Sequence, residues 1–370
     1  MGATPPDLRC RDCGREHAAG PDEPWRCSCG APLELDVDSH PEGGPPTPGA
    51  LDRERGLWAL DAFLPVERRV TLGEGWTPLV DARGWDAAFK LEYVFPTGSF
   101  KDRGATTTLS RAAGLGVERV LEDSSGNAGA AIATYAARAG VDATVYVPAD
   151  AKPAKLAAIE RAGADVERVA GSRQDVTDAC IAAADAGEGW YASHAWNPAF
   201  LAGTATFAME VCAQRGWSAP DAVVCPLGHG TLFLGACRGF RALREAGWID
   251  DVPRLLGAQA AGVAPVVEEV RGADGDGDER NDVADGIQIA APARAAEIRD
   301  AIEATDGDAI AVGADATRAA LERLREVGFY VEPTAAVGPA ALEAYRESGV
   351  LSPDADVVVP LTGSGLKDPA

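Results

Sequence analysis

From about residue 70 onward, short apolar runs alternate with longer alanine-rich stretches. The short runs are rich in β-branched residues, which indicates strands buried on both faces, as in a parallel sheet. Many of the alanine-rich stretches end in glycine, as helices commonly do. The pattern predicts strands within 142–148, 221–228, 254–260, 308–313 and 355–363, with helices such as 152–163 and 316–328 between them.

This alternation predicts the α/β fold class, with open and mainly parallel sheets. In such sheets ligands bind beyond the carboxyl ends of the strands, so chemistry is expected in the loops that follow them. The first seventy residues do not share the pattern. Residues 1–40 carry four closely spaced cysteines, and 41–70 read as a Pro/Gly-rich linker with an N-terminal extension.

The four N-terminal cysteines form two short-range pairs, Cys10-x-x-Cys13 and Cys27-x-Cys29. This spacing is typical of a tetrahedral structural zinc site, as in zinc ribbons. About thirty residues cannot bury enough core to fold alone, whereas zinc supplies ~10–16 kcal/mol in comparable peptides. Disulfides are the alternative, and a cytoplasmic chain disfavours them. Because all four positions are cysteine, no ligand position is left open for catalysis.

The charge balance changes the picture of the surface. Fifty-seven Asp and Glu stand against 34 Lys and Arg, a formal charge of −23. Such a chain is a poor partner for nucleic acid or for an anionic membrane, and it suits a high-salt cytoplasm, where repulsion is screened. We find no secretory signal and no apolar run of about 18 residues or more, so we expect a halophilic, cytoplasmic protein.

The stretch FPTGSFKDRGA at 95–105 places Lys101 near the start of a predicted helix. Ser99 and Asp102 have the spacing of a capping pair, which would start the helix at Phe100. A helix start disfavours an ammonium by at most ~2 kcal/mol, so burial would have to supply the rest of the shift toward a neutral amine. A neutral lysine is what Schiff-base chemistry requires, although a solvated lysine is an equally good interpretation of this stretch alone.

Three further loops have the composition of ligand-binding turns. Ser124-Ser125-Gly126-Asn127 follows a predicted strand and offers hydroxyls and backbone N–H groups to an anion. Gly228-His229-Gly230-Thr231-Leu232 opens a helix and has the composition of a phosphate cradle. Thr362 follows the last strand in a Gly-rich loop. Each could instead be a tight turn chosen for packing, and the dinucleotide fingerprint G-x-G-x-x-G is missing.

Together these motifs resemble the pyridoxal-phosphate enzymes of fold type II, the tryptophan-synthase-β fold. The cysteine segment, PTGSFKDRG, DGI at 285–287, EPTAA at 332–336 and TGSGLKD resemble threonine synthases in particular. The resemblance implies a small α/β subdomain at about 106–205, inserted in a large subdomain formed by about 71–105 and 206–370. The whole catalytic region would then be 71–370, and the family expectation is a homodimer.

The resemblance also implies a role for each motif. Lys101 would bind the cofactor and then move protons on the substrate, with Phe100 beside the ring. Asn127 would contact the phenolic oxygen of the cofactor, and Ser124, Ser125 and Gly126 would hold the substrate carboxylate. The cradle 228–232 would hold the cofactor phosphate. Thr362 would face the pyridine nitrogen, and its neutral hydroxyl would stabilise a pyridinium less than a carboxylate does, which makes the cofactor a weaker electron sink.

The implied reaction converts O-phospho-L-homoserine and water to L-threonine and phosphate. Three departures leave the substrate open: Phe95 stands where Asn is usual, the serine loop also resembles serine/threonine dehydratases, and the glycine loop differs from the G-N-x-G-N form. The alternatives are therefore a threonine or serine dehydratase, or another β-replacement enzyme such as a cysteine or cysteate synthase. Without pyridoxal phosphate, the alternatives are a zinc-containing binding module or a Rossmann oxidoreductase.

Overall fold

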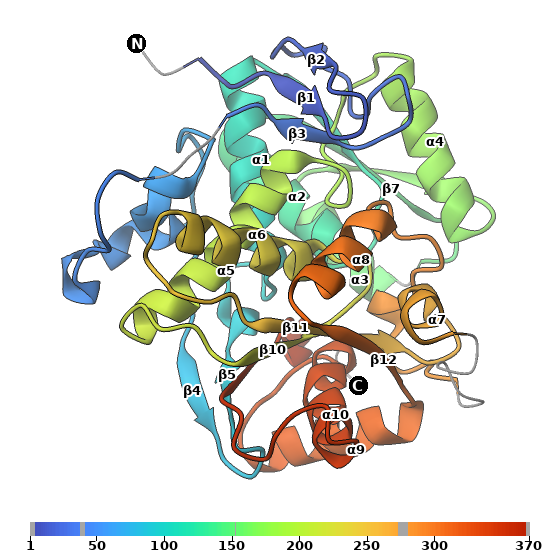
Figure 1. Ribbon diagram of the computed structural model, residues 1–370. Helices are drawn as coiled ribbons and strands as arrows, with labels where there is room; N and C mark the ends of the chain where they lie inside the picture. The colour runs from blue at the N-terminus through green and yellow to red at the C-terminus, as the bar shows by residue number, and fades with distance from the viewer. Residues whose placement is uncertain (1–3, 38–40, 152, 273–279, 368–370) are drawn as a thin grey trace. The chain divides into compact units, whose positions relative to one another are not determined.

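The computed structural model describes residues 4–37, 41–151, 153–272 and 280–367. These residues form two compact units, shown with their elements in Figure 1. The first unit contains 1–41, 52–75 and 101–204, and the second contains 42–51, 76–100 and 205–370. Helix α5 (Pro198–Gln214) belongs to both, because the division falls after Thr204. Residues 1–3 and 38–40 of the expected zinc-ribbon segment lie outside the described residues.

The second unit is built on a six-stranded sheet of order β12-β11-β10-β13-β5-β4. All neighbouring strands are parallel except the edge pair β4 and β5, and the central strands are fully buried. Helices α9 and α10 cover one face and α6 and α8 the other (Figure 1). The strands are β4 (Leu79–Ala82), β5 (Ala87–Lys90), β10 (Ala222–Pro226), β11 (Arg254–Ala260), β12 (Asp308–Val312) and β13 (Val357–Pro360).

The helices of this unit include α6 (Thr231–Glu245), α7 (Pro265–Arg271), α8 (Ala295–Ala304), α9 (Ala314–Glu326) and α10 (Pro333–Glu347). Short 3-10 turns occur at η1 (Pro48–Ala50), η3 (Glu92–Val94), η5 (Asp285–Ile287) and η6 (Gly365–Lys367).

The first unit contains a parallel four-stranded sheet of order β8-β7-β6-β9. Alternate residues of its strands face opposite layers: Val145 packs with α2 and α3, whereas Tyr146 packs with α4. The elements are α1 (Lys101–Leu115), β6 (Arg119–Glu122), α2 (Asn127–Ala139), β7 (Asp142–Pro148), α3 (Pro153–Arg161), β8 (Asp165–Val169), α4 (Arg173–Asp185) and β9 (Trp190–Tyr191), with the 3-10 segment η2 (Arg53–Phe63).

The cysteine segment adds a three-stranded antiparallel sheet to this unit, with β1 (Leu8–Cys10) between β2 (Glu16–His17) and β3 (Leu33–Leu35). Side chains of Glu23 and Trp25 link it to the α/β layer. Glu23 makes a buried ion pair with Arg111 of α1, at 2.5 Å. Trp25 packs edge-on against Tyr191 and Trp196. The described part of the segment is thus packed into the first unit.

The predicted strands are confirmed as an α/β fold, and two of them, 142–148 and 254–260, have the expected bounds. Two carbonyl groups of the Pro/Gly-rich stretch after the cysteines accept hydrogen bonds from the rest of the second unit. The indole N–H groups of Trp217 and Trp248 donate to the carbonyls of Pro46 and Gly43, at 2.6 and 2.9 Å. No helix among the described residues is long and apolar enough to cross a membrane.

Candidate active site

Lys101 is the first residue of α1 and is half-buried. The predicted capping pair before it is wrong. The Ser99 hydroxyl is buried without a hydrogen-bond partner among the described residues, so it does not cap the helix. The Ser99 backbone forms an isolated β-bridge with Gly363. Helix α1 therefore begins one residue later than expected, and Lys101 lies at its positive end.

The predicted anion loop, 124–127, follows β6 and ends at the first residue of α2. Its chain is tightly curled: the Ser124 hydroxyl accepts a hydrogen bond from the Gly126 N–H at 3.3 Å. A side chain at Gly129 would lie 1.9 Å from the Ser124 carbonyl oxygen, so only glycine permits this turn. Asn127 is the first residue of α2, and no side chain caps this helix. The start of a helix carries N–H groups that suit an anionic acceptor.

A buried carboxyl–imidazole pair that the sequence analysis missed lies at the same end of this sheet. Glu122 ends β6, and His194 follows β9, the strand beside it. His194 Nδ1 lies 2.7 Å from Glu122 Oε1, and the His194 backbone N–H donates to Oε2 at 3.2 Å. Asp123 accepts from Thr177 and Tyr191 at 2.6 and 2.8 Å.

Burial disfavours the charged form of both groups. Burial raises the pKa of Glu122 well above its ordinary value, and the Asp123 carboxylate raises it further. Burial lowers the pKa of His194 to about 3, and the Lys101 charge acts in the same direction. Glu122, Asp123 and His194 bring possible metal-ligand atoms within 4.8 Å of one another. Since hydrogen bonds already engage these atoms, they form a satisfied network and not an open ligand set.

In the second unit, the glycine loop follows β10 and is closely packed. Gly228 is buried, and a Cβ there would lie 3.2 Å from the Cα of Ile287. Gly230 has a φ of 77° and precedes α6 without any side-chain cap. A Cβ at Gly230 would lie 2.6 Å from Cδ1 of Ile298. Thr231 and Leu232 are buried in the first turn of α6, and His229 is half-buried.

Thr362 follows β13, which pairs in parallel with β10. The Thr362 loop and the glycine loop therefore both begin at the carboxyl ends of neighbouring strands. Thr362 is 4% exposed, and its hydroxyl has no hydrogen-bond partner among the described residues. Its carbonyl accepts from the N–H of Phe100 at 3.1 Å. The residue before Lys101 is thereby fixed to the Thr362 loop.

The four N-terminal cysteines converge as the spacing predicted. Their sulfurs lie within 4.8 Å of one another, with Cys10 to Cys29 at 3.5 Å and Cys13 to Cys27 at 3.6 Å. A tetrahedral zinc ion with bonds of about 2.3 Å would separate its sulfurs by about 3.8 Å. The backbone N–H of Cys29 contributes to lowering the pKa of the Cys27 thiol to about 5.

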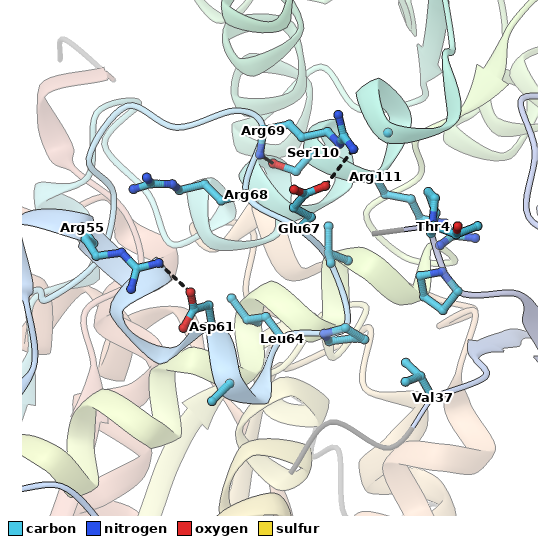
Figure 2. A pocket seen from close by; sticks show the side chains of 16 residues that line it. Thr4, Val37, Arg55, Asp61, Leu64, Glu67, Arg68, Arg69, Ser110 and Arg111 are labelled. Carbon is cyan, nitrogen blue, oxygen red and sulfur yellow. Dashed lines mark hydrogen bonds and ion pairs between the residues drawn. The ribbon is translucent and has the colours of Figure 1, made fainter. Parts of the chain in front are cut away.

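Figure 2 shows a pocket of about 590 Å³ in the first unit, lined by residues of the N-terminal segment, η2 and α1. No residue with a predicted cofactor, substrate or metal role lines it. Three of its four arginines are paired: Arg55 with Asp61, Arg69 with Glu67 and Arg111 with Glu23. The pocket thus offers little free positive charge and is separate from the predicted chemistry.

Comparison with known proteins identifies the family. The sequence profile described as pyridoxal-phosphate dependent enzyme matches residues 70–363. A threonine synthase of Methanocaldococcus jannaschii is 35% identical, with 98% of this chain and 93% of that protein covered. One from Methanosarcina acetivorans is 34% identical, with coverage of 98% and 92%.

The chain belongs to the pyridoxal-phosphate dependent enzymes, in the threonine synthase family.

Solved structures agree on the fold of this family member. Maize serine racemase superposes with a TM-score of 0.66 at 21% identity, covering 85% of this chain and 93% of that one. A threonine deaminase of T.th. gives a TM-score of 0.64 at 24% identity, with 78% and 92% covered. Fold type II is therefore confirmed, and the interpretations as a zinc-containing binding module or a Rossmann oxidoreductase are wrong.

The residues of this pyridoxal-phosphate enzyme fit its cofactor. In the second unit, the orphaned Thr362 hydroxyl lacks the partner that a pyridine nitrogen would supply, and the side-chain-free loop at Gly228 and Gly230 leads into the start of α6. In the first unit, the positive charge of Lys101 lowers the pKa of both Glu122 and His194. The structure thus places the predicted site residues in two groups, one in each unit.

Proposed function

We propose that this enzyme converts O-phospho-L-homoserine and water to L-threonine and phosphate. The observation that carries the proposal is the match to threonine synthases over nearly the whole chain, at 35% and 34% identity. The motifs around Lys101 and Thr362 fall within the matched region. The reaction is a carbon–oxygen elimination at a phosphate ester, followed by the addition of water.

Lys101 is proposed as the residue that binds the cofactor and moves protons on the substrate. Pyridoxal phosphate, when bound, supplies the electron sink that makes the substrate's α-proton acidic. The Lys101 amine would take that proton and return one to the carbon skeleton, for which it must be able to exist without charge. Its place at the start of α1 favours the neutral amine by ~0.3–1 kcal/mol.

Two loops are proposed to bind the two anionic groups of the ligands, which are the substrate carboxylate and the cofactor phosphate. Ser124, Ser125 and Gly126, before the uncapped α2, would hold the substrate carboxylate, and Asn127 would contact the phenolic oxygen of the cofactor. The loop at 228–232 would hold the cofactor phosphate. Phe100 would pack beside the ring. Thr362 would donate to or accept from the pyridine nitrogen as a neutral group, which favours elimination over transamination.

The test is an assay of the purified holoenzyme with O-phospho-L-homoserine, following phosphate and the carbon product together. Equal amounts of phosphate and L-threonine are expected, and a Lys101→Ala variant should yield neither. Conversion of threonine or serine to a keto acid, without turnover of phosphohomoserine, would make the enzyme a dehydratase. Exchange of a β-substituent for a thiol or sulfite would make it a cysteine or cysteate synthase.

We further propose that Cys10, Cys13, Cys27 and Cys29 bind one structural zinc ion. Their sulfur separations of 3.5 and 3.6 Å support a tetrahedral four-thiolate site. Metal analysis of the wild-type protein should give one zinc per chain, and Cys13→Ser should lose most of it. Cys237→Ala, which changes a buried core cysteine, is the matched control and should keep its zinc. A wild-type protein without zinc would contradict this proposal.

The remaining proposals concern the oligomeric state, location, binding partners and subdomains of the enzyme. We propose that it is a homodimer acting on a small amino-acid substrate in a salt-rich cytoplasm, and that it does not bind nucleic acid or membranes. The charge of −23 supports the last two points. We also propose that 101–204 and the two flanking segments of the second unit act as the small and large catalytic subdomains, close to the limits of about 106–205 expected from the sequence.

A further inference from the structure

The sheet of the second unit does not by itself fix the two loops that are proposed to hold the cofactor. In the described chain, the register of β10 with β13 ends at Val223 and Val358. Gly228 of the glycine loop and Thr362 both follow those positions, so their separation depends on contacts outside this strand pair. The DGI motif, which the proposed reaction leaves without a role, lies in the DGI turn (281–289), which makes such contacts.

Ile287 of the DGI turn packs against the glycine loop. A Cβ at Gly228 would lie 3.2 Å from Cα of Ile287 and 3.3 Å from Cγ1 of Ile289. Both isoleucines are buried. Because these distances are shorter than an ordinary carbon–carbon contact, no side chain fits between the two segments at residue 228. The position of the glycine loop therefore depends on the position of the DGI turn.

Gly286 of the same turn contacts the start of α10. A Cβ at Gly286 would lie 3.0 Å from Oγ1 of Thr334, in the first turn of α10. Two residues earlier, the backbone N–H of Glu332 donates to the carbonyl of Gly363 at 2.9 Å. Gly363 directly follows Thr362 in the chain. The DGI turn is thereby connected to the Thr362 loop through the residues that begin α10.

Asn281 anchors the DGI turn to the sheet. Its amide nitrogen donates to the carbonyl of Val312 and to the hydroxyl of Thr317, both at 2.9 Å. Its amide oxygen accepts from the backbone N–H groups of Val283 and Ala284, both at 3.1 Å. A side-chain amide has two N–H groups and two lone pairs, and this completely buried one uses all of them. The turn is thus fixed to the end of β12 and to α9.

We propose that the DGI turn is a spacer that sets the separation of the glycine loop and the Thr362 loop, and that Asn281 holds this spacer in place. The inference rests on the proposed function, which assigns the cofactor phosphate to the glycine loop and the pyridine nitrogen to Thr362. Asn281, Gly286 and Ile287 are positioning residues, which act through the two loops and not by touching the cofactor.

A spacer affects a ligand that bridges both loops more than a ligand that occupies one of them. Pyridoxal phosphate carries its phosphate and its ring nitrogen on one small frame. The advantage of linking two groups in one ligand is lost if the geometry forbids both contacts at once. Pyridoxal, which lacks the phosphate, and inorganic phosphate each need only one loop. Their affinities therefore separate the spacing of the loops from the integrity of each loop.

The first test compares Gly286→Ala with Gly44→Ala in the cofactor-free chain, titrated with each of these three ligands. Neither glycine has a left-handed backbone, and a Cβ at Gly44 would meet nothing within 4 Å. We expect Gly286→Ala to weaken pyridoxal phosphate about tenfold and to change the other two ligands less than about twofold. Gly44→Ala should bind all three as wild type does. Equal weakening of pyridoxal and pyridoxal phosphate, or no weakening, would overturn the proposal.

Removing the obstacle should restore binding. Thr334→Ala deletes the hydroxyl that a Cβ at residue 286 would meet. Combined with Gly286→Ala, it should recover most of the affinity for pyridoxal phosphate, whereas two independent losses would add. A double variant that binds no better than Gly286→Ala would contradict the contact between the turn and α10 on which the spacer depends.

A second test changes the surroundings of Asn281 and leaves Asn281 itself intact. Thr317→Val removes the hydroxyl that accepts from Asn281, so the amide must turn toward the Gly313 carbonyl, 3.4 Å away. Thr305→Val is the matched control. Thr305 is also a buried threonine that donates to a helical carbonyl, and its hydroxyl accepts from the N–H of Leu255.

Phosphorus NMR of the holoenzyme reports on the cofactor phosphate in both variants. We expect Thr317→Val to shift this resonance and to weaken pyridoxal phosphate about fivefold, as the loss of one hydrogen bond would. Thr305→Val should change neither, although urea denaturation should show a similar loss of stability in both variants. The same effect on the cofactor in both variants, or in neither, would overturn the role of Asn281.

The spacer and the proposed function fail in different ways. If the two loops do not hold the cofactor, Thr362→Val leaves the affinity for pyridoxal phosphate unchanged. If Thr362→Val weakens it while Gly286→Ala and Thr317→Val do not, the loops hold the cofactor and the spacer is wrong. Formation of threonine by the wild-type enzyme tests only the reaction, because a dehydratase with the same cofactor would need the same spacing.

Discussion

At the scale of single residues, the buried hydroxyl of Thr362 is a group that cofactor binding would use and that folding does not require. A buried hydroxyl without a partner costs free energy that a methyl group in its place does not. The adjoining carbonyl, by contrast, is satisfied by the N–H of Phe100. The position of the loop is therefore fixed by the backbone, which leaves the hydroxyl for a ligand.

We predict that Thr362→Val weakens the binding of pyridoxal phosphate without destabilising the protein. Valine keeps the shape and removes the hydroxyl, so cofactor affinity should fall by about 1 kcal/mol or more, whereas the free energy of unfolding of the cofactor-free chain should stay level or rise. Equilibrium titration with the cofactor and urea denaturation measure the two effects. A loss of stability with unchanged affinity would show that the hydroxyl has a structural partner.

His194 gives the prediction for pH. Its pKa in the folded chain, about 3, is below the ordinary 6.5, so the unfolded chain takes up this proton first as the solution is acidified. The His194 contribution to stability is therefore present above pH 6.5 and is lost as the pH falls toward 3, by at most ~1.4 kcal/mol per pH unit. In urea denaturation from pH 7 to 5, His194→Gln should lose less stability than wild type. An equal loss would contradict the buried neutral imidazole.

At the scale of secondary-structure elements, the turn between β10 and α6 depends on the absence of a side chain. Gly230 combines a left-handed backbone with a close neighbour, Ile298 of α8. The two effects can be separated, because Gly216 has a similar φ of 70° and no atom within 4 Å of where a Cβ would lie.

We therefore predict that Gly230→Ala is more destabilising than Gly216→Ala. The control should cost about 1 kcal/mol for the backbone conformation alone. Gly230→Ala should cost ~1–3 kcal/mol more, because Ile298 must move in a packed interior. Thermal unfolding of both variants gives the comparison, and equal losses would mean that Ile298 yields without cost.

The same elements show what the sequence could and could not predict. The loops at 124–127 and 228–232 were predictable, because their glycines and hydroxyls directly follow apolar strands in the chain. The Glu122–His194 pair was not, since it joins residues 72 positions apart through the pairing of β6 with β9, a strand of two residues. The Ser99 cap was predicted from local spacing alone, and the pairing of the Ser99 backbone with a distant segment, at Gly363, was not visible in that spacing.

At the scale of the whole molecule, the net charge of −23 is the dominant property. Several acidic groups are compensated within the fold, such as Glu210 by the buried Lys90 at 2.8 Å. The remaining acidic side chains repel one another wherever salt does not screen their charges. Such repulsion is strong at ~0.1 M salt, with a Debye length of ~10 Å, and weak at ~1 M, with ~3 Å.

We predict that the thermal midpoint of the protein rises as potassium chloride increases from about 0.1 M to about 2 M. Sucrose is the control, because an excluded uncharged solute strengthens burial without screening charge. Most of the rise should come within the first molar of salt, where the Debye length shortens most. A midpoint that responds to sucrose but not to potassium chloride would contradict charge repulsion as the cause.

The packing of the cysteine segment also has a consequence during synthesis on the ribosome. Its anchors arrive late: Arg111 follows Glu23 by 88 residues, and Asp185, which accepts from the Trp25 indole, follows by 160. At a translation rate of ~5–20 residues per second, about 8–30 s pass between the synthesis of Trp25 and that of Asp185. During that interval the nascent segment has only its own three short strands and its four thiols. Early capture of a metal ion would protect those thiols from oxidation until the rest of the first unit has been translated.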